Sequence, residues 1–239
     1  METILIRERY KIVRILYETD DYMLAEAVDI QDRETPVCLI NLYAGALLHR
    51  YGRIYAGLQG GQFTAFQRVF LERETLAAVF SDSRGLPIDR MFFKGDGWKW
   101  PERMEYAELF LNAALRLEEV PPEIGCAVLQ ADNVLFPTYQ RAVELRFAVL
   151  PMEEMNRREL ALLAGDHLRK ILPDGLKVQD EEHAFLGKLQ DFQTLVSLYS
   201  AWREARGEIQ AGYEEWESKG LIKKGITLLK RAVKRRRSK

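Results

Sequence analysis

The residues best placed to do chemistry lie in the stretch 126–146, where polar side chains interrupt an apolar run. Asp132 and Asn133 are adjacent, and Glu144 and Arg146 follow after a short apolar segment. A carboxylate can accept a proton from a hydroxyl group, and carboxylate and amide oxygens can hold magnesium. These residue types suit phosphoryl transfer only if the surrounding elements bring an acid, a metal ligand and a cation together.

The layout of this stretch resembles the catalytic loop and metal-binding strand of protein kinases. In a kinase the loop reads H-R-D-L-x-x-x-N, where the Asp accepts the substrate proton and the Asn holds magnesium, and D-F-G follows on a nearby strand. Here positions 126–133 read CAVLQADN, so Asn133 is kept but Val128 replaces the Asp. D-F-G has become Arg146, Phe147 and an alanine. The resemblance therefore implies a degenerate kinase-like site without its base and its metal-binding Asp.

The elements that would position this site begin with alternating apolar and polar residues over 9–16, 22–30 and 36–43. This alternation predicts a three-stranded antiparallel meander. A kinase has a glycine-rich turn after its first strand and a phosphate-binding Lys on its third. Here no glycine occurs between residues 16 and 24, and Asn41 stands at the Lys position. Both departures argue against a bound triphosphate.

The following segments are expected to complete an N-terminal lobe. Five glycines predict a long loop over 44–62, with a helical turn over 47–51 left open. Apolar residues near helical spacing predict an αC-like helix over 63–80 that carries Glu74. A hairpin with an Asp-Gly turn is expected over 86–104. A buried charge needs a partner, so we expect Arg146 to face either an acidic side chain or an anionic ligand at the cleft between the lobes, with Glu74 as the candidate side chain.

The C-terminal half predicts helices over 105–120, 153–171 and 184–206. We therefore expect an α+β, kinase-like two-lobed fold with an antiparallel N-lobe sheet, an αC-like helix, a reduced helical C-lobe and a C-terminal basic helix. The expected divisions are an N-lobe over 1–104, a C-lobe over 105–206 and a helical basic tail over 207–239.

The tail carries a charge that the net value of −1 hides. Residues 221–239 hold nine Lys and Arg and no acid, whereas the rest of the chain has 26 bases against 36 acids. Ile222, Ile226, Leu229 and Val233 recur at helical spacing, which predicts a cationic amphipathic helix. Such a helix suits an acidic protein or an anionic membrane surface, or it packs on the domain and serves solubility. The residues expected to bind are Lys223, Lys224, Lys230, Arg231, Lys234, Arg235, Arg236 and Arg237.

Composition argues against several other classes. Cys38 and Cys126 are far apart, and the three His have no metal-ligand spacing, so neither a disulfide scaffold nor a metal site is indicated. Nucleic acid is disfavoured because no aromatic residues interleave with the basic charges of the tail. The start of the chain lacks the basic region of a signal peptide, and no stretch is long enough to span a membrane. We expect a cytoplasmic protein without cofactor or metal, peripheral at the inner face of the membrane if the tail binds there.

The function expected from the resemblance is that of a non-catalytic, pseudokinase-like scaffold or regulatory protein-binding module. Phosphoryl transfer needs a Lys, an acid base and metal-binding acids, and these are lost together. Domains of this kind occur in bacterial secretion and signalling machinery, some of them tethered to membranes. Two alternatives stay open. An atypical phosphotransferase would use Asp132 or Glu144 with Asn133, and an unrelated α+β adaptor would owe its kinase-like motifs to chance.

Overall fold

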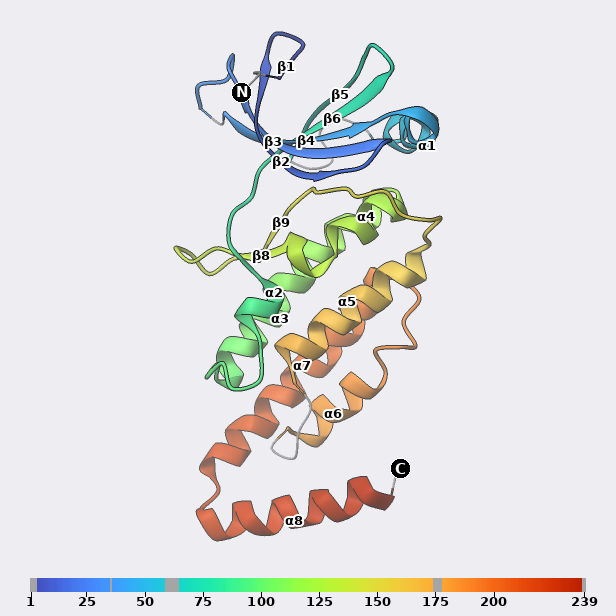
Figure 1. The fold of residues 1–239 in the computed structure, drawn as a ribbon. Coiled ribbons are helices and arrows are strands. Elements are labelled where there is room, and N and C mark those ends of the chain that lie inside the picture. Colours follow the sequence, from blue (N-terminus) through green and yellow to red (C-terminus); the bar gives the residue numbers. More distant parts are fainter. Residues whose placement is uncertain (1–3, 35, 59–64, 174–177, 238–239) are drawn as a thin grey trace.

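A computed structural model describes residues 4–34, 36–58, 65–173 and 178–237. Within these residues the fold is α+β, with a curled antiparallel sheet of six strands and eight α-helices. The sheet lies at one end of an elongated molecule, and the helices extend from it to the C-terminal helix at the other end (Figure 1).

The large sheet contains the predicted meander, which is confirmed. Its strand order is β1-β2-β3-β4-β6-β5, and each pair of neighbours is antiparallel. Asn41 lies in the middle of the sheet, with Leu24 opposite it on one side and Ala78 on the other. The strands are β1 Leu5–Ile6, β2 Tyr10–Glu18, β3 Tyr22–Asp29, β4 Val37–Tyr43, β5 Phe66–Glu72 and β6 Thr75–Ser81.

A helix, α1 Gly45–Ala56, occupies the segment for which a long loop was predicted, so that prediction is wrong over this range. Tyr51 and Tyr55 are fully or almost fully buried, and the Tyr51 ring stacks on Tyr43 at 4.2 Å. The burial of these rings stabilises the helix by more than an internal glycine costs, which is about 1 kcal/mol. Residues 59–62 of the predicted loop lie outside the described residues.

The αC-like helix predicted over 63–80 is wrong, because β5 and β6 form a hairpin there, and residues 63–64 lie outside the described part. The apolar residues of β6 are fully buried, and a buried run has no alternation that separates a strand from a helix. Arg73 turns the chain with a positive φ of 53°. Glu74 is an exposed residue of this turn and not of a helix.

The hairpin predicted over 86–104 is also wrong. The chain forms the short strand β7 Leu86–Pro87 and the short helix α2 Ile88–Met91 before α3 begins at Trp100. The Asp96 carboxylate accepts hydrogen bonds from the backbone N–H of Phe93 and Trp98 and from Arg103. Asp96 therefore organises a compact loop in place of a strand turn.

The predicted helical half is confirmed in type but not in its boundaries. The helix expected over 105–120 starts earlier and ends in a 3₁₀ turn, and the one expected over 184–206 is two helices, because Thr194 begins a new helix with a capping box. The expected domain divisions at 104/105 and 206/207 both fall inside helices. The elements are α3 Trp100–Leu115, η1 Arg116–Glu119, α4 Pro122–Val128, η2 Ala131–Asn133, β8 Val134–Phe136, β9 Glu144–Leu145, α5 Arg157–Ile171, α6 Asp180–Gly187, α7 Leu195–Ser218 and α8 Leu221–Arg237.

A continuous apolar core joins the sheet to the helices. It includes Phe80 of β6, Phe110 of α3 and Trp202 of α7. The short strands β7, β8 and β9 form a second sheet between the two parts. Among the helices that the structure describes, none combines the length and apolar character needed to cross a bilayer.

Candidate functional site

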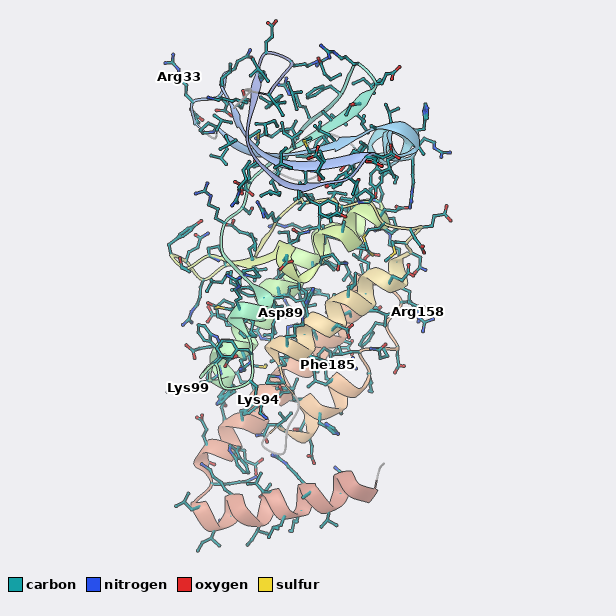
Figure 2. The ribbon with its side chains drawn as sticks, in the orientation of Figure 1. Arg33, Asp89, Lys94, Lys99, Arg158 and Phe185 are labelled. Carbon is teal, nitrogen blue, oxygen red and sulfur yellow. The ribbon has the colours of Figure 1, made fainter. Side chains whose placement is uncertain are left out.

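Five of the predicted kinase-like site residues lie in or near residues 146–152, which we call the strap; they are Asn41, Val128, Asn133, Arg146 and Phe147, whereas Glu74 lies elsewhere. The strap leaves β9, passes between the large sheet and α4, and leads into α5 (Figure 1). Side chains fill the layer on both of its sides (Figure 2). Its fixed course is explained by hydrogen bonds from buried residues of the sheet, α1 and η2.

Asn41 binds the strap from the sheet side. Its Oδ1 accepts hydrogen bonds from the Val149 N–H at 2.8 Å and from the Tyr22 hydroxyl at 2.9 Å. Its Nδ2 donates to the Phe147 carbonyl at 3.1 Å. The side chain is fully buried, so both ends of its amide are committed to the protein's own chain.

A cluster of tyrosines continues this contact. The Tyr43 hydroxyl donates to the Val149 carbonyl at 2.7 Å and lies 3.1 Å from the Tyr55 hydroxyl. The Met152 N–H donates to the Tyr51 hydroxyl at 3.0 Å. Burial raises the pKa of Tyr43 and of Tyr55 well above the ordinary value of a phenol, so both rings stay neutral.

Asn133 holds the strap from the opposite side. The Asn133 Nδ2 donates to the Ala127 carbonyl at 2.8 Å and to the Ala148 carbonyl at 3.1 Å. The backbone carbonyl of Asn133 accepts a hydrogen bond from the Arg146 N–H. The structure therefore brings Asn41 and Asn133 to the same short segment of the strap, residues 146–149. Their amides link the sheet and the helical part through the strap.

Phe147 and Val128 have apolar roles. The Phe147 ring stacks on Phe80 of β6, with centroids 4.9 Å apart and an angle of 12°. Val128 is fully buried at the end of α4, next to the Ala127 carbonyl that Asn133 binds. Neither residue offers a group that could accept a proton from a substrate.

Arg146 pairs with acids, as predicted, but Glu74 is not its partner. Its Nε donates to Asp82 Oδ1 at 2.9 Å and its Nη2 to Glu26 Oε1 at 3.2 Å. Glu26 also receives a bidentate hydrogen bond from Arg14, and this bond is the main cause that lowers the pKa of Glu26, with Arg146 adding to it. The network joins β2, β3, the strap and the segment after β6.

Sequence reasoning missed Asp82 and Glu26 as partners of Arg146. The available signal was general: a half-buried guanidinium needs acidic partners. It could not select these two residues while 63–80 was taken for a helix, because the hairpin is what brings the end of β6 beside the strap.

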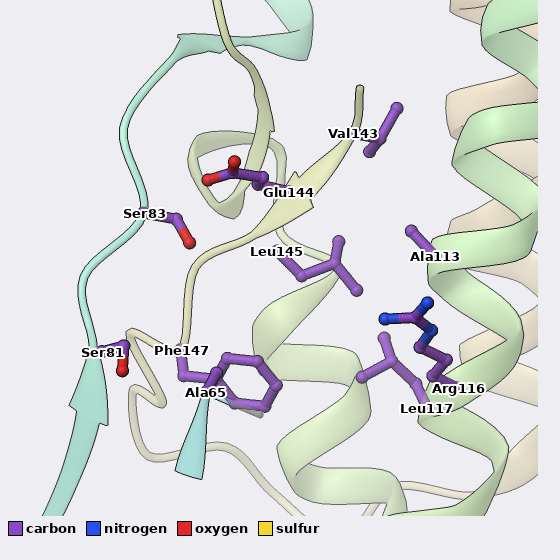
Figure 3. A pocket seen from close by; sticks show the side chains of 10 residues that line it. All are labelled: Ala65, Ser81, Ser83, Ala113, Arg116, Leu117, Val143, Glu144, Leu145 and Phe147. Atoms are coloured by element: carbon purple, nitrogen blue, oxygen red, sulfur yellow. The ribbon is translucent and has the colours of Figure 1, made fainter. Parts of the chain in front are cut away.

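A cavity of about 420 Å³ lies beside the strap. Figure 3 shows Ser81 and Ser83 on one side of it, Ala113, Arg116 and Leu117 on the other, and residues of β9 with Phe147 between them. Glu144 is at its wall, whereas Asp132 is exposed on η2. Of the two acids considered for phosphoryl transfer, only Glu144 lines the cavity.

The remaining candidate groups are the metal-ligating side chains and the two cysteines. In the described part of the chain, no three His, Cys, Asp or Glu side chains form a group that could hold a metal ion. Cys38 and Cys126 are fully buried, and burial raises the pKa of each thiol to about 12. Neither thiol has the exposure and low pKa of a reactive cysteine.

The predicted tail residues lie apart from the strap, on α8 at the far end of the molecule (Figure 1). Arg231 and Lys234 contact Asp180 of α6, and Lys223 and Lys230 are exposed. The side chains of Arg235, Arg236 and Arg237 lie outside the described part. Neither the protein-family models nor the curated proteins compared with this chain gave a match.

Proposed function

We propose that this chain is a non-catalytic, protein-kinase-like binding module that acts as a scaffold or regulator. The observation that carries the proposal is that Tyr22, Phe147 and Val149 engage both ends of the Asn41 amide. In the kinases that this chain resembles, the phosphate-binding Lys stands at the position of Asn41, and the metal-binding D-F-G stands at the start of the strap. A neutral amide that is hydrogen-bonded to the backbone of the strap has no charge to bind phosphate and no free oxygen to bind a metal ion.

The order of elements supports the resemblance. A meander is followed by a helix, a hairpin, a long helix and a loop with short strands, which is the order expected from a kinase-like fold. The helix and the hairpin are formed by other residues than expected, namely α1 and β5–β6. In a kinase, an acid on the helix pairs with the strand Lys. The α1 sequence, GALLHRYGRIYA, contains no acid, so the missing Lys and the missing acid are consistent with each other.

Electrostatics at the strap also favour a non-catalytic role. Arg146 takes the position of the metal-binding Asp, and its guanidinium is engaged by Asp82 and Glu26. A cation at this point repels magnesium, and the two acids near it are neutralised by the pairing. We infer that the ion pairs which a kinase uses for chemistry are replaced here by contacts that hold the strap.

The test is a calorimetric titration of the full chain with ATP, in the presence and absence of magnesium, together with an assay for phosphate transfer to a generic acceptor protein. We expect no magnesium-dependent heat and no transfer. Asn133→Ala serves as the matched variant, because Asn133 is the one metal ligand that the resemblance retains. We expect Asn133→Ala to give the same titration as the parent chain.

A micromolar, magnesium-dependent affinity that is lost in Asn133→Ala contradicts the proposal. That result would favour the phosphotransferase, and Glu144→Gln would then separate a catalytic from a structural role of Glu144. A binding role is tested by affinity capture with the full chain, which we expect to retain a specific protein partner.

A further inference from the structure

The outward face of α8 is apolar. Ile222, Ile226, Leu229 and Val233 form one line along the helix, and their side chains are 81%, 50%, 70% and 52% exposed. We call these four residues the stripe. Burying large apolar side chains is the main source of folding free energy, so an exposed line of four in a charged helix needs an explanation other than the stability of this domain.

The opposite face of α8 is the one that contacts the domain. The Arg231 side chain is 10% exposed; its Nη2 donates to Gln179 Oε1 at 2.6 Å and its guanidinium lies over the Trp216 ring. Lys224 also lies near the Trp216 ring, and Lys234 pairs with Asp180. Because these contacts fix the rotation of the helix, the stripe points away from the protein.

Exposed cations border the stripe. Lys223 and Lys230 lie on one side of it at helical spacing, and within the described residues neither makes an ion pair. The sequence of α8 contains no acid, and three further arginines follow Lys234. Apolar residues flanked by Lys and Arg are the pattern of a helix that lies in the plane of a membrane interface.

We propose that α8 binds an anionic lipid surface, with the stripe among the acyl chains and Lys223 and Lys230 at the headgroups. The helix lies across the end of the molecule farthest from the sheet, so a flat surface can approach it without meeting other elements (Figure 1). Ile222 borders a hollow at the junction of α7 and α8, and Ile226, Leu229 and Val233 continue from it along the exposed face of α8, which favours a planar partner over a second helix. Charge and apolar area act together, since each alone gives only weak membrane binding.

The experiment measures partitioning of the full chain into vesicles of phosphatidylcholine alone and of equal parts phosphatidylcholine and phosphatidylglycerol. We expect binding to the anionic vesicles only, weakened as ionic strength rises through the physiological range. Ile226→Ser/Leu229→Ser and Lys223→Gln/Lys230→Gln should each weaken the partitioning by about tenfold or more. All four side chains are exposed, so both variants should keep the melting temperature of the parent chain.

Matched controls carry the same changes elsewhere. Phe93→Ser/Val196→Ser removes two apolar side chains that are 57% and 54% exposed, and Lys11→Gln/Arg33→Gln removes two exposed cations. Arg33 lies at the end of the molecule opposite α8 (Figure 2). Both controls should bind anionic vesicles as the parent chain does.

Several results would overturn the proposal. Equal binding to neutral vesicles, or no binding to either kind, removes the anionic lipid surface as the partner. Binding that survives Ile226→Ser/Leu229→Ser reduces the interaction to charge alone. Absence of vesicle binding together with salt-sensitive binding to polyglutamate would assign α8 to an acidic protein, and a dimer lost in the stripe variant would assign it to a second copy of this chain.

Discussion

Arg146 and Asp82 form an ion pair in which the Arg146 Nε lies 2.9 Å from Asp82 Oδ1, and the Asp82 side chain is 3% exposed. The pair ties the strap to the segment that follows β6. Since the Asp82 side chain is almost completely removed from water, leaving this carboxylate without its partner would be costly. The same arginine reaches Glu26 of β3, so one side chain joins three segments that are far apart in the sequence.

Arg146→Ala should therefore lower the free energy of unfolding by about 2–4 kcal/mol, because it leaves the Asp82 carboxylate buried without its partner. Chemical denaturation at neutral pH measures the change. Asp82→Asn in the Arg146→Ala background should recover part of the loss. Arg14→Ala is the matched control: Arg14 pairs with the same Glu26 but is 64% exposed, so its loss should cost at most about 1 kcal/mol. Equal effects of the two variants would mean that Arg146 does not stabilise the strap.

Leucine is similar in volume to asparagine, yet Asn41→Leu should lower the free energy of unfolding by more than a volume-conserving change does. It leaves the Tyr22 hydroxyl, the Val149 N–H and the Phe147 carbonyl without their buried partner. Each unsatisfied buried group costs about 1–3 kcal/mol, so we expect a loss of roughly 3 kcal/mol or more in the free energy of unfolding.

The control for Asn41 is Gln67→Ala, which removes one hydrogen bond to the Ser81 hydroxyl at a half-buried position. Its cost should stay near 1 kcal/mol. Hydrogen exchange of the Val149 amide gives a second measurement, since it should accelerate in Asn41→Leu and not in Gln67→Ala. An unchanged Val149 exchange rate would be inconsistent with the role given to Asn41.

The meander and the type of most helices could be predicted because their information is local. Alternation marks a half-buried strand, and the recurrence of apolar residues in 105–120 marks a helix face. Two elements could not be predicted in this way. The glycines of 45–57 indicated a loop, yet Tyr51 and Tyr55 pack on the sheet and hold a helix. The residues of β6 are buried on both faces and therefore carry no period.

The same division between local and long-range information applies to the candidate site. Asn41, Asn133 and Arg146 were selected from motif positions, and the structure brings them to one strap. The partner of Arg146 was a long-range pairing, and its identity depended on where β6 ends. Burial energetics predicted that an acidic side chain or an anionic ligand must face Arg146, but only the tertiary fold determines which group it is.

His167 should make the protein sensitive to mild acid. Its ring is 4% exposed, and Nε2 lies 2.6 Å from the Leu129 carbonyl, which can only accept, so Nε2 carries the hydrogen. Nδ1 is then an unprotonated, buried atom without a hydrogen-bond partner among the described residues. Burial is the largest cause that lowers the pKa of His167 below its ordinary value of 6.5, and Lys170 adds to it, against Asp89, Asp166 and the Leu129 carbonyl.

The direction follows from the proton balance. As pH falls below 6.5 the unfolded chain protonates this histidine and the folded chain does not, so the stability present above 6.5 is lost progressively, by up to about 1.4 kcal/mol per pH unit. His167→Gln retains an N–H donor and should flatten the dependence between pH 6.5 and 5, measured by denaturant midpoints. His49→Gln changes an exposed histidine and should leave the dependence as in the parent chain. A parallel pH profile in His167→Gln would rule out His167 as its source.

Deletion of residues 221–239 should leave the fold intact. Within its described residues, α8 buries one side chain, that of Arg231, which contacts Gln179 and Asp180. Loss of such contacts is worth about 1–2 kcal/mol, which corresponds to a fall of a few degrees in the melting temperature of a chain this long. Leu168→Ala, in the core at α5, is the reference for a large loss, expected at about 2–5 kcal/mol. If the truncated chain melts as low as Leu168→Ala, the stripe stabilises the domain, and its exposure would no longer point to a lipid surface.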